Sequence, residues 1–342
     1  MEKHYDTSTT VRGLLKRTGI QEYLEKSGIT EIAINRAGEI FTESAQGWQR
    51  YDEPRCELNL LNQLANALAI YNSKQLNTQQ PIQSVVLPDG ERGQIVIPPA
   101  CERDTVSITI RRPSPVRLSL EDYLSSGRLA NFRDVSEHLE VPSDVLLQSW
   151  ELDLLKAKAE KDIQRFLECA IQHKLNIVLV GATGSGKTTF TKALVDRVPH
   201  ETRIVTIEDT HELDLPHHPN KVHLYYGKDV SPKQVVSSCM RQKPDRIFLT
   251  ELRGDEAWDY ITLLNTGHPG SITTVHANDC RSAYYRIASL IKQSEVGQTL
   301  DFEYIMREVM TTLDLILFFD RTYLTQLYYD PVRKWKLQRG RV

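Results

Sequence analysis

The stretch that decides the fold is "NIVLVGATGSGKTTF", residues 176–190. Its apolar run "IVLV" indicates a short buried strand. The ten residues that follow the run hold three glycines, three threonines and one lysine, and they lead into "TKALVDRV", which is expected to continue a helix. A strand, a glycine-rich turn and a helix in direct succession indicate a loop that holds phosphate.

Residues 181–188 fit the pattern G-x-x-x-x-G-K-[ST]. Glycines allow main-chain N–H groups to point inward at a phosphate, and the following helix presents its positive end. Lys187 is expected on the β- and γ-phosphates, and the Thr188 hydroxyl on Mg²⁺. The sequence therefore predicts a nucleoside triphosphate site with Mg²⁺, formed by Gly181, Thr183, Gly184, Ser185, Gly186, Lys187, Thr188 and Thr189.

Around this loop, strands and helices alternate from about residue 155 onward. Apolar runs such as "RIVTI", "RIFLT" and "SITTV" are separated by helical patterns, which predicts βαβ units and a mainly parallel sheet. The last segment, "LDLILFFD…YLTQLYYD…KWKLQRG", is expected as antiparallel strands at a sheet edge.

Carboxylates follow two of these strands. "RIVTIED" ends in Glu208 and Asp209, and "RIFLTELRG" contains Glu251. Ligands of parallel sheets bind at the carboxyl ends of the strands, so both glutamates are predicted beside the phosphate loop. "TGHPGSITTVHAND" adds His276 at another strand end, where it can sense the γ-phosphate, whereas the two histidines of "LPHHPN" (217 and 218) are expected on a surface loop.

The first ~115 residues predict a separate small α+β unit. Residues 58–72 have helical apolar spacing, "SVVLPDGERGQIVI" indicates a hairpin, and residues 105–110 alternate like a strand. Prolines at 113 and 115 interrupt regular structure. We therefore expect an α/β chain with an N-terminal α+β domain (1–115), a linker (116–150) and a C-terminal phosphate-loop domain (151–342).

Composition excludes several classes of protein. A net charge of −3 and a pI near 6.4 disfavour a chain that coats nucleic acid. Five widely spaced cysteines, with no C-x-x-C pair, indicate free thiols in a reducing compartment. No apolar run could span a bilayer, so a cytoplasmic location is expected. "NKVH" (220–223) fails as a GTPase base-reading motif, and no Arg-rich kinase lid is evident.

The ordered boxes "GATGSGKTT", "TIED", "RIFLTELRG" and "TGHPGSITTVHA" resemble those of the secretion traffic ATPases. These are the hexameric ring motors of type IV secretion and conjugation, related to the ATPases of type II secretion and type IV pili. "ITEIAINRAGEIF", "LPDGERGQIVIPPACE" and "SITIRRPS" resemble the type IV secretion branch. The resemblance implies an N-terminal domain, a linker and a RecA-like motor domain, with ATP bound between the two domains.

The resemblance also assigns roles to single residues. It implies that Glu208 is the general base or water positioner and that Glu251 acts through Mg²⁺, although the division of labour between them stays open. His276 matches the histidine box. One departure is Thr250, which stands where the family often has glycine.

Arginines of the N-terminal domain enter through the same resemblance. Arg92 in "GERGQ" and Arg111 in "TIRRP" match arginines that reach the triphosphate in the family. There they would neutralise charge growing on the γ-phosphoryl group. Arg112 is adjacent and stays an alternative to Arg111.

The implied function is that of a homohexameric ATPase. ATP-driven domain closure would power pilus assembly or substrate transfer, at the inner face of the bacterial inner membrane. Other secretion-system ATPases and inner-membrane components are the expected partners, and no strong nucleic-acid binding is expected. A nucleic-acid translocase and a nucleotide-gated scaffold are the alternatives, and DNA, protein and pilus subunits stay open as cargo.

Overall fold

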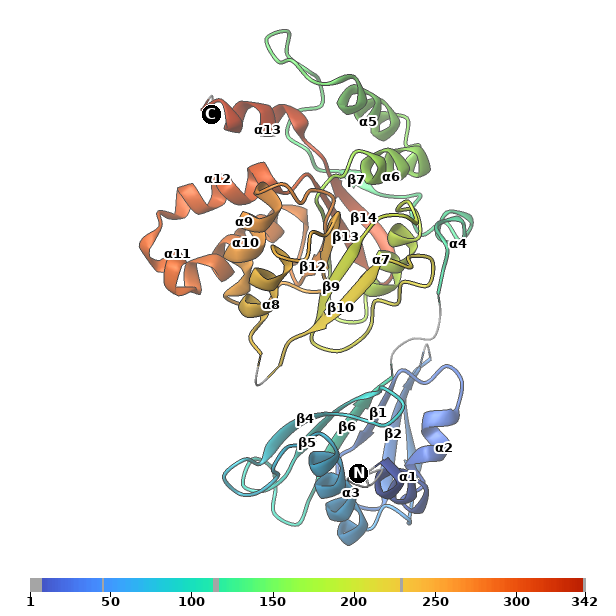
Figure 1. Cartoon of the computed structure of the whole chain (residues 1–342). Coiled ribbons are helices and arrows are strands. Elements are labelled where there is room, and N and C mark those ends of the chain that lie inside the picture. Colours follow the sequence, from blue (N-terminus) through green and yellow to red (C-terminus); the bar gives the residue numbers. More distant parts are fainter. Residues whose placement is uncertain (1–7, 45, 113–116, 228–229, 341–342) are drawn as a thin grey trace. The chain divides into compact units, whose positions relative to one another are not determined.

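The structure, a computed structural model, describes residues 8–44, 46–112, 117–227 and 230–340. The chain divides into two compact units, Met1–Pro115 and Val116–Val342. Each unit has its own sheet, as the ribbon in Figure 1 shows. Each unit also has its own buried hydrophobic clusters.

Helices cover one face of an antiparallel sheet in the first unit. The six strands run in the order β3-β2-β1-β6-β5-β4, and every neighbouring pair is antiparallel. The strands are β1 (Glu31–Ile34), β2 (Glu39–Ser44), β3 (Gly47–Asp52), β4 (Ile82–Val86), β5 (Arg92–Val96) and β6 (Ser107–Arg111). The helices are α1 (Ser8–Arg17), α2 (Ile20–Glu25) and α3 (Leu58–Tyr71).

Alternation along the strands builds the core of this unit. Ile32, Ile95 and Ile108 are fully buried and pack in one cluster with residues of α3 such as Leu61 and Leu64. On each strand, the residues next to these isoleucines point to the opposite, more polar face of the sheet, because successive side chains of a strand alternate. The predicted helix at 58–72, the hairpin and the strand at 105–110 are confirmed.

The second unit has an eight-stranded sheet in the order β10-β9-β11-β12-β8-β13-β14-β7. The strands from β10 to β13 in that order are parallel, and β14 runs antiparallel to β13. The strands are β7 (Arg133–Asp134), β8 (Ile177–Val180), β9 (Ile204–Glu208), β10 (Lys221–Tyr225), β11 (Arg246–Leu249), β12 (Ile272–Val275), β13 (Leu315–Asp320) and β14 (Tyr323–Tyr328). The predicted mainly parallel sheet is therefore confirmed.

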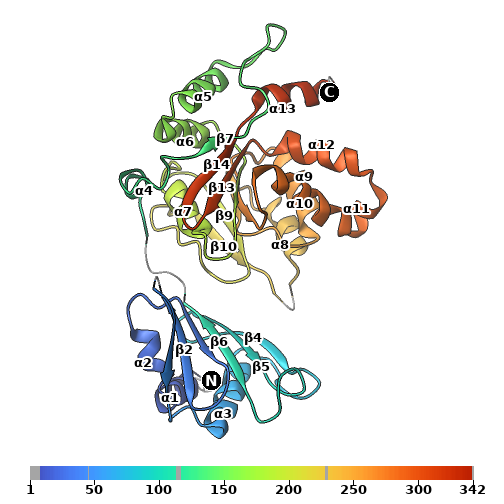
Figure 2. The ribbon, with the colours of Figure 1, turned by 180° about the vertical axis from the view of Figure 1, so that it is seen from behind.

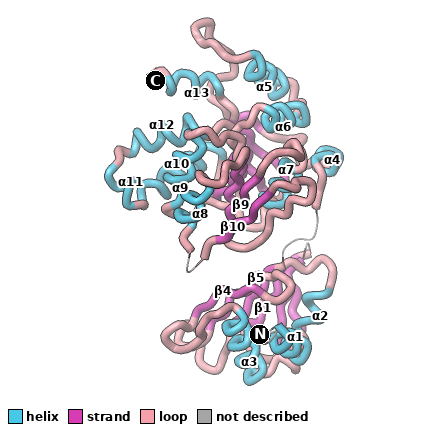
Figure 3. Tube along the Cα trace, viewed as in Figure 1, coloured by secondary structure: helices cyan, strands magenta, loops and turns pink. Residues whose placement is uncertain are grey.

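Helices pack on both faces of this sheet, as Figures 2 and 3 show. The helices are α4 (Leu120–Ser125), α5 (Ser149–Ala159), α6 (Ile163–Gln172), α7 (Lys187–Val195), α8 (Pro232–Cys239), α9 (Glu256–Asn265), α10 (Cys280–Gln293), α11 (Glu295–Thr299), α12 (Phe302–Thr312) and α13 (Pro331–Gln338). One buried cluster joins α4, α6 and α7 to the sheet, and another joins α8, α9, α10 and α12. Alternate buried residues of β8 serve the two clusters, which explains its uninterrupted apolar run.

Residues 116–150, predicted as a linker, form part of the second unit where they are described. Tyr123 of α4 packs edge-on against Phe190 of α7, with ring centroids 4.8 Å apart. Strand β7 pairs with β14 and adds an edge strand to the sheet.

Two expectations for the second unit are wrong. "KWKLQ" lies in helix α13 and not in a strand, because Pro331 starts the helix and the Asp330 side chain accepts a hydrogen bond from the Arg333 amide as its cap. His218 is fully buried and not a surface residue. Its Nε2 lies 3.2 Å from the Val198 carbonyl oxygen.

Candidate functional site

The loop after β8 takes backbone angles that suit glycine. Gly184 and Gly186 have φ of 76° and 80°, in the left-handed region. Gly181 has φ of 151°, and a Cβ built there would lie 2.4 Å from the Phe319 carbonyl oxygen. Helix α7 begins at Lys187, directly after Gly186. The strand, loop and helix expected from the sequence are thus in place, with the helix N-terminus at the loop.

Lys187 lies over this loop. Its Nζ donates to the carbonyl oxygens of Gly181 and Ala182, at 2.8 Å each. The Ser185 hydroxyl is buried and has no hydrogen-bond partner among the described residues. A buried donor without a partner is costly, and a phosphate oxygen would satisfy it. The loop residues therefore fit a bound polyphosphate.

Thr188 connects the phosphate loop to the acidic segment after β9. Its Oγ1 donates to Glu212 Oε2 at 3.2 Å. Thr188 is the residue predicted to ligate Mg²⁺, so Glu212 brings a carboxylate to the expected ion. Sequence reasoning missed Glu212 because it lies four residues beyond the strand end, where spacing alone does not show which way a side chain turns.

Glu208, the predicted base, is fully buried and fully engaged. Its Oε2 accepts from the main-chain amides of Glu212 and Leu213, at 2.8 and 2.9 Å, and its Oε1 accepts from Thr206 at 2.9 Å. Burial by itself raises the pKa of Glu208, but hydrogen bonds from His223, the two amides and Thr206 outweigh it, so the pKa lies below its usual value. In this arrangement the carboxylate anchors the loop that carries Glu212.

Glu251 belongs to a charged network at the ends of β11 and β12. Its Oε2 accepts from Arg253 at 2.6 Å, and its Oε1 lies 3.3 Å from His276 Nε2. Arg253 also donates to Asp209 at 2.9 Å. The structure thus brings together Glu251, His276 and the acidic box, as predicted from strand ends, and adds Arg253 as the residue that joins them.

His276 lies close enough to the phosphate loop for the positive charge of Lys187 to act on its imidazole. Burial lowers the pKa of His276, and the positive charge of Lys187 lowers it further, while Glu251 raises it. The net lowering favours the neutral imidazole, which can donate one hydrogen bond and accept another. Such a group can respond to the presence of a γ-phosphate oxygen.

Thr250, the departure from the family pattern, has a use in this sheet. Its Oγ1 donates to the Ile207 carbonyl oxygen at 3.2 Å, and its own carbonyl accepts from Thr274 at 2.9 Å. Thr188, Thr250 and Thr274 also line one small pocket. The added hydroxyl therefore ties β11 to its neighbour and leaves Glu251 at the strand end.

The three arginines considered for the triphosphate, all in the first unit, differ in their surroundings. Arg92 and Arg111 are directly opposite each other on β5 and β6. Arg111 is 46% exposed, and its Nε lies 3.7 Å from Glu31. Arg112 instead donates to the carbonyl oxygens of Lys26 and Ile29, at 2.6 and 3.1 Å. Its guanidinium therefore has a structural use within the unit, which the sequence could not distinguish.

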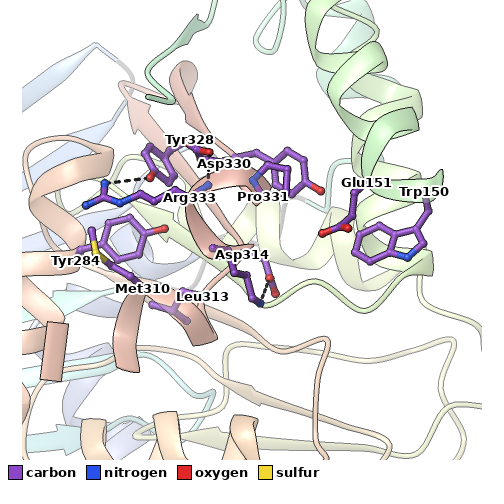
Figure 4. Close-up of a pocket in the computed structure, with 12 residues that line it drawn as sticks. Trp150, Glu151, Tyr284, Met310, Leu313, Asp314, Tyr328, Asp330, Pro331 and Arg333 are labelled. Carbon is purple, nitrogen blue, oxygen red and sulfur yellow. Dashed lines mark hydrogen bonds and ion pairs between the residues drawn. The ribbon is translucent and has the colours of Figure 1, made fainter. Parts of the chain in front are cut away.

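A separate pocket of the second unit lies among α5, α10, α12 and α13 and holds none of the predicted site residues (Figure 4). An ion pair and a hydrogen bond lie in its wall: Lys334 pairs with Asp314, and Arg333 donates to the Tyr328 hydroxyl at 3.3 Å. None of the described residues that line the pocket belongs to the phosphate loop, so the pocket is separate from the predicted phosphate site.

A parallel sheet with a phosphate loop at one strand end, and with glutamates and a histidine at neighbouring strand ends, defines a P-loop nucleotide-binding protein of the RecA-like class. Residues 16–318 match the family described as "Type II/IV secretion system protein", and the chain belongs to this family.

Individual relatives specify the branch. The type IV secretion system protein VirB11 of Bartonella henselae is 40% identical, with 94% of each chain covered. That of Brucella suis is 39% identical over 92% of this chain and 89% of the relative. The predicted resemblance to type IV secretion ATPases, and the predicted ATPase activity, are confirmed.

Comparison with solved structures points to the same branch and the same fold. The crystal structure of the VirB11 ATPase from the Brucella suis type IV secretion system, in complex with sulphate, superposes with a TM-score of 0.54 at 39% identity, covering 95% of this chain and 99% of that one. The pilus retraction motor PilT with bound ADP has a TM-score of 0.58 at 18% identity, covering 96% of this chain and 87% of that one, which is a likeness of fold.

In the described part of the chain, no helix has the length and apolar character needed to cross a membrane.

Proposed function

We propose that this protein is a Mg²⁺-dependent ATPase that works as a homohexameric motor of a bacterial type IV secretion or conjugation system. The observation that carries the proposal is the joining of phosphate loop and acidic loop: Thr188 and Glu212 share a hydrogen bond at the loop that Lys187 covers. A site with a cation for the phosphates and carboxylates at the metal position has the groups that ATP hydrolysis needs.

Different residues of the site would bind the phosphates and the Mg²⁺ ion. The main-chain amides of 181–188 and Lys187 bind the phosphates, and His276 hydrogen-bonds near the γ-phosphate. Thr188 and Glu251 would hold Mg²⁺ or its water ligands. When bound, Mg²⁺ neutralises charge on the β- and γ-phosphate oxygens.

Two carboxylates have distinct parts in this proposal. Glu212 orients the attacking water, because its carboxylate already lies at Thr188. Glu208 acts as a positioning residue, because both of its oxygens accept hydrogen bonds from its own segment and from Thr206.

Arg92 and Arg111 supply positive charge to the triphosphate. The two arginines are directly opposite each other on neighbouring strands, so their charges can act together on one anion. Loss of the γ-phosphate on hydrolysis would release these arginines, and that differential contact is the switch that drives motion. Peripheral attachment to the inner membrane, and contact with other secretion-system ATPases and inner-membrane components, complete the proposal.

Phosphate release by the purified protein, combined with its mass in solution, tests the proposal. We expect release that requires Mg²⁺, and a particle of six copies of the 39.2-kDa chain in the presence of ATP. ATP binding without phosphate release would instead indicate a nucleotide-gated scaffold. Salt-sensitive stimulation by DNA would indicate a nucleic-acid translocase.

A further inference from the structure

A histidine-rich cluster lies at the edge of the second sheet, on the side of Glu208 away from its amide contacts. His223 comes from the edge strand β10, where it is opposite Thr206 of β9 in the parallel register. His211 comes from the loop after β9, and its ring packs edge-on against that of His223 with centroids 4.6 Å apart. Both rings turn a nitrogen toward one carboxylate oxygen of Glu208.

The separations of these atoms match those around a small metal ion. Glu208 Oε1 lies 3.5 Å from His211 Nδ1 and 3.4 Å from His223 Nδ1. The three atoms all lie within 4.8 Å of one another. An ion with bonds of about 2.0–2.1 Å to nitrogen and oxygen holds tetrahedral ligand atoms about 3.3–3.4 Å apart. The carboxylate is therefore at ligand spacing from both imidazoles before any ion enters.

The surroundings of the cluster favour an ion that exchanges with solvent. Glu208 is fully buried, the His223 side chain is 17% exposed and that of His211 is 46% exposed. A protein site with three ligands and one open side is typical of metals that keep a water ligand. Thr206 Oγ1 lies 2.8 Å from His223 Nδ1 and donates to Glu208 Oε1, so the strand pair already orients both groups.

The chemistry of the donors separates this cluster from the Mg²⁺ site. Mg²⁺ prefers oxygen ligands, whereas imidazole nitrogens suit Zn²⁺ and similar transition metals. To bind an ion through Nδ1, His223 must carry its proton on Nε2. The imidazole can adopt that tautomer without a change of fold. Glu208 Oε2 would keep its two amide contacts, so the ion and the acidic loop can be held together.

We propose that Glu208, His211 and His223 form a binding site for one transition-metal ion of the zinc class, open to solvent on the side of His211. The site shares Glu208 with the proposed ATPase function, where Glu208 positions the acidic loop, but it contains none of the residues proposed to contact the nucleotide or Mg²⁺. It restrains the loop that carries Glu212 by joining it to strand β10.

Cobalt(II) is the probe, added to the full-length protein without nucleotide or Mg²⁺. We expect one equivalent to bind with visible ligand-field absorption, without a thiolate charge-transfer band, and to be displaced by Zn²⁺. Because loss of a supporting group already costs about 10–100-fold in metal affinity, loss of a direct ligand in His211→Ala or His223→Ala should weaken binding at least that much. His217→Ala is the matched control, since His217 stacks on His200 in a different histidine group.

Each outcome decides the proposal. Absence of ligand-field absorption in the wild type, or binding unaffected in both His211→Ala and His223→Ala, would overturn it. Loss of binding in His217→Ala alone would overturn it too, by assigning the ion to the other histidines. If His223→Ala fails to fold, the half-exposed His211 still decides. ATP turnover plays no part in the measurement, so failure here leaves the proposed ATPase function untouched.

Discussion

Thr188 and Glu212 are joined by a hydrogen bond of 3.2 Å, from the threonine hydroxyl to the carboxylate. The contact connects the first turn of α7 to the loop after β9, and Glu208 fixes that loop by accepting its amides. The position of Glu212 therefore depends on a buried carboxylate four residues away, and the phosphate loop and acidic loop form one unit of structure.

Replacement of Glu212 by Gln should remove the water-orienting charge while keeping the size of the side chain. Because one group that acts on the transition state is commonly worth about 10²–10³ in rate, we expect turnover to fall by that factor with ATP affinity retained. Steady-state phosphate release and equilibrium ATP binding measure the two effects. Glu201→Gln, at an exposed position, is the control. Unchanged turnover in Glu212→Gln would assign the water to another residue.

Arg111→Ala and Arg112→Ala should separate function from stability. An arginine that stabilises the γ-phosphoryl charge is worth about 10³-fold or more in turnover, so Arg111→Ala should lose that much with little change in melting temperature. Arg112→Ala loses two hydrogen bonds to main-chain carbonyls and should lower the stability of the first unit by about 2–4 kcal/mol. Thermal melts and phosphate release on both variants check this. The reverse pattern would make Arg112 the functional arginine.

Gly181→Ala should destabilise the second unit more than Gly184→Ala. A Cβ at Gly181 would lie 2.4 Å from the Phe319 carbonyl oxygen, a main-chain atom that cannot swing aside. A Cβ at Gly184 meets nothing within 4 Å, so only the left-handed backbone penalty of about 1–2 kcal/mol applies. Chemical denaturation should place Gly181→Ala at least about 1 kcal/mol below Gly184→Ala. Equal stabilities would show that the Phe319 contact relaxes.

The stability of the second unit should fall with pH below about 6.5, the usual pKa of histidine. Burial lowers the pKa of His218, so the unfolded chain binds this proton more readily than the folded one. The contribution of His218 is therefore fully present above pH 6.5 and is lost as pH falls through the lowered pKa. Melting temperatures from pH 5 to 8 should fall less steeply in His218→Gln than in the wild type. His217→Gln, at the exposed neighbour, should follow the wild type.

The phosphate loop could be predicted from the sequence because its determinants are local. An apolar run, three glycines and a helix start within fifteen residues leave one arrangement, and the structure has it. The strand-end positions of Glu208, Glu251 and His276 could also be predicted from the sequence, because the carboxyl ends of parallel strands lie at the same edge of a sheet.

Other features could not be predicted from the sequence, because they depend on contacts that the spacing of residues along the chain does not show. Glu212 lies near Thr188 because Glu208 turns back to accept its amide. His218 is buried although prolines flank its loop, because its ring reaches the Val198 carbonyl. The helix at 331–338 had its signals in the sequence, an aspartate followed by proline, but the alternation of "KWKL" also fits a strand.

Hydrolysis of Mg²⁺·ATP by the Lys187→Ala variant is the sharpest test of whether the phosphate loop carries the ATPase site. We expect the variant to keep its fold but to lose phosphate release by at least about 10²-fold, whereas Lys156→Ala, at an exposed position of α5, should stay at the wild-type rate. A folded Lys187→Ala protein that releases phosphate at the wild-type rate would show that the phosphate loop takes no part in hydrolysis.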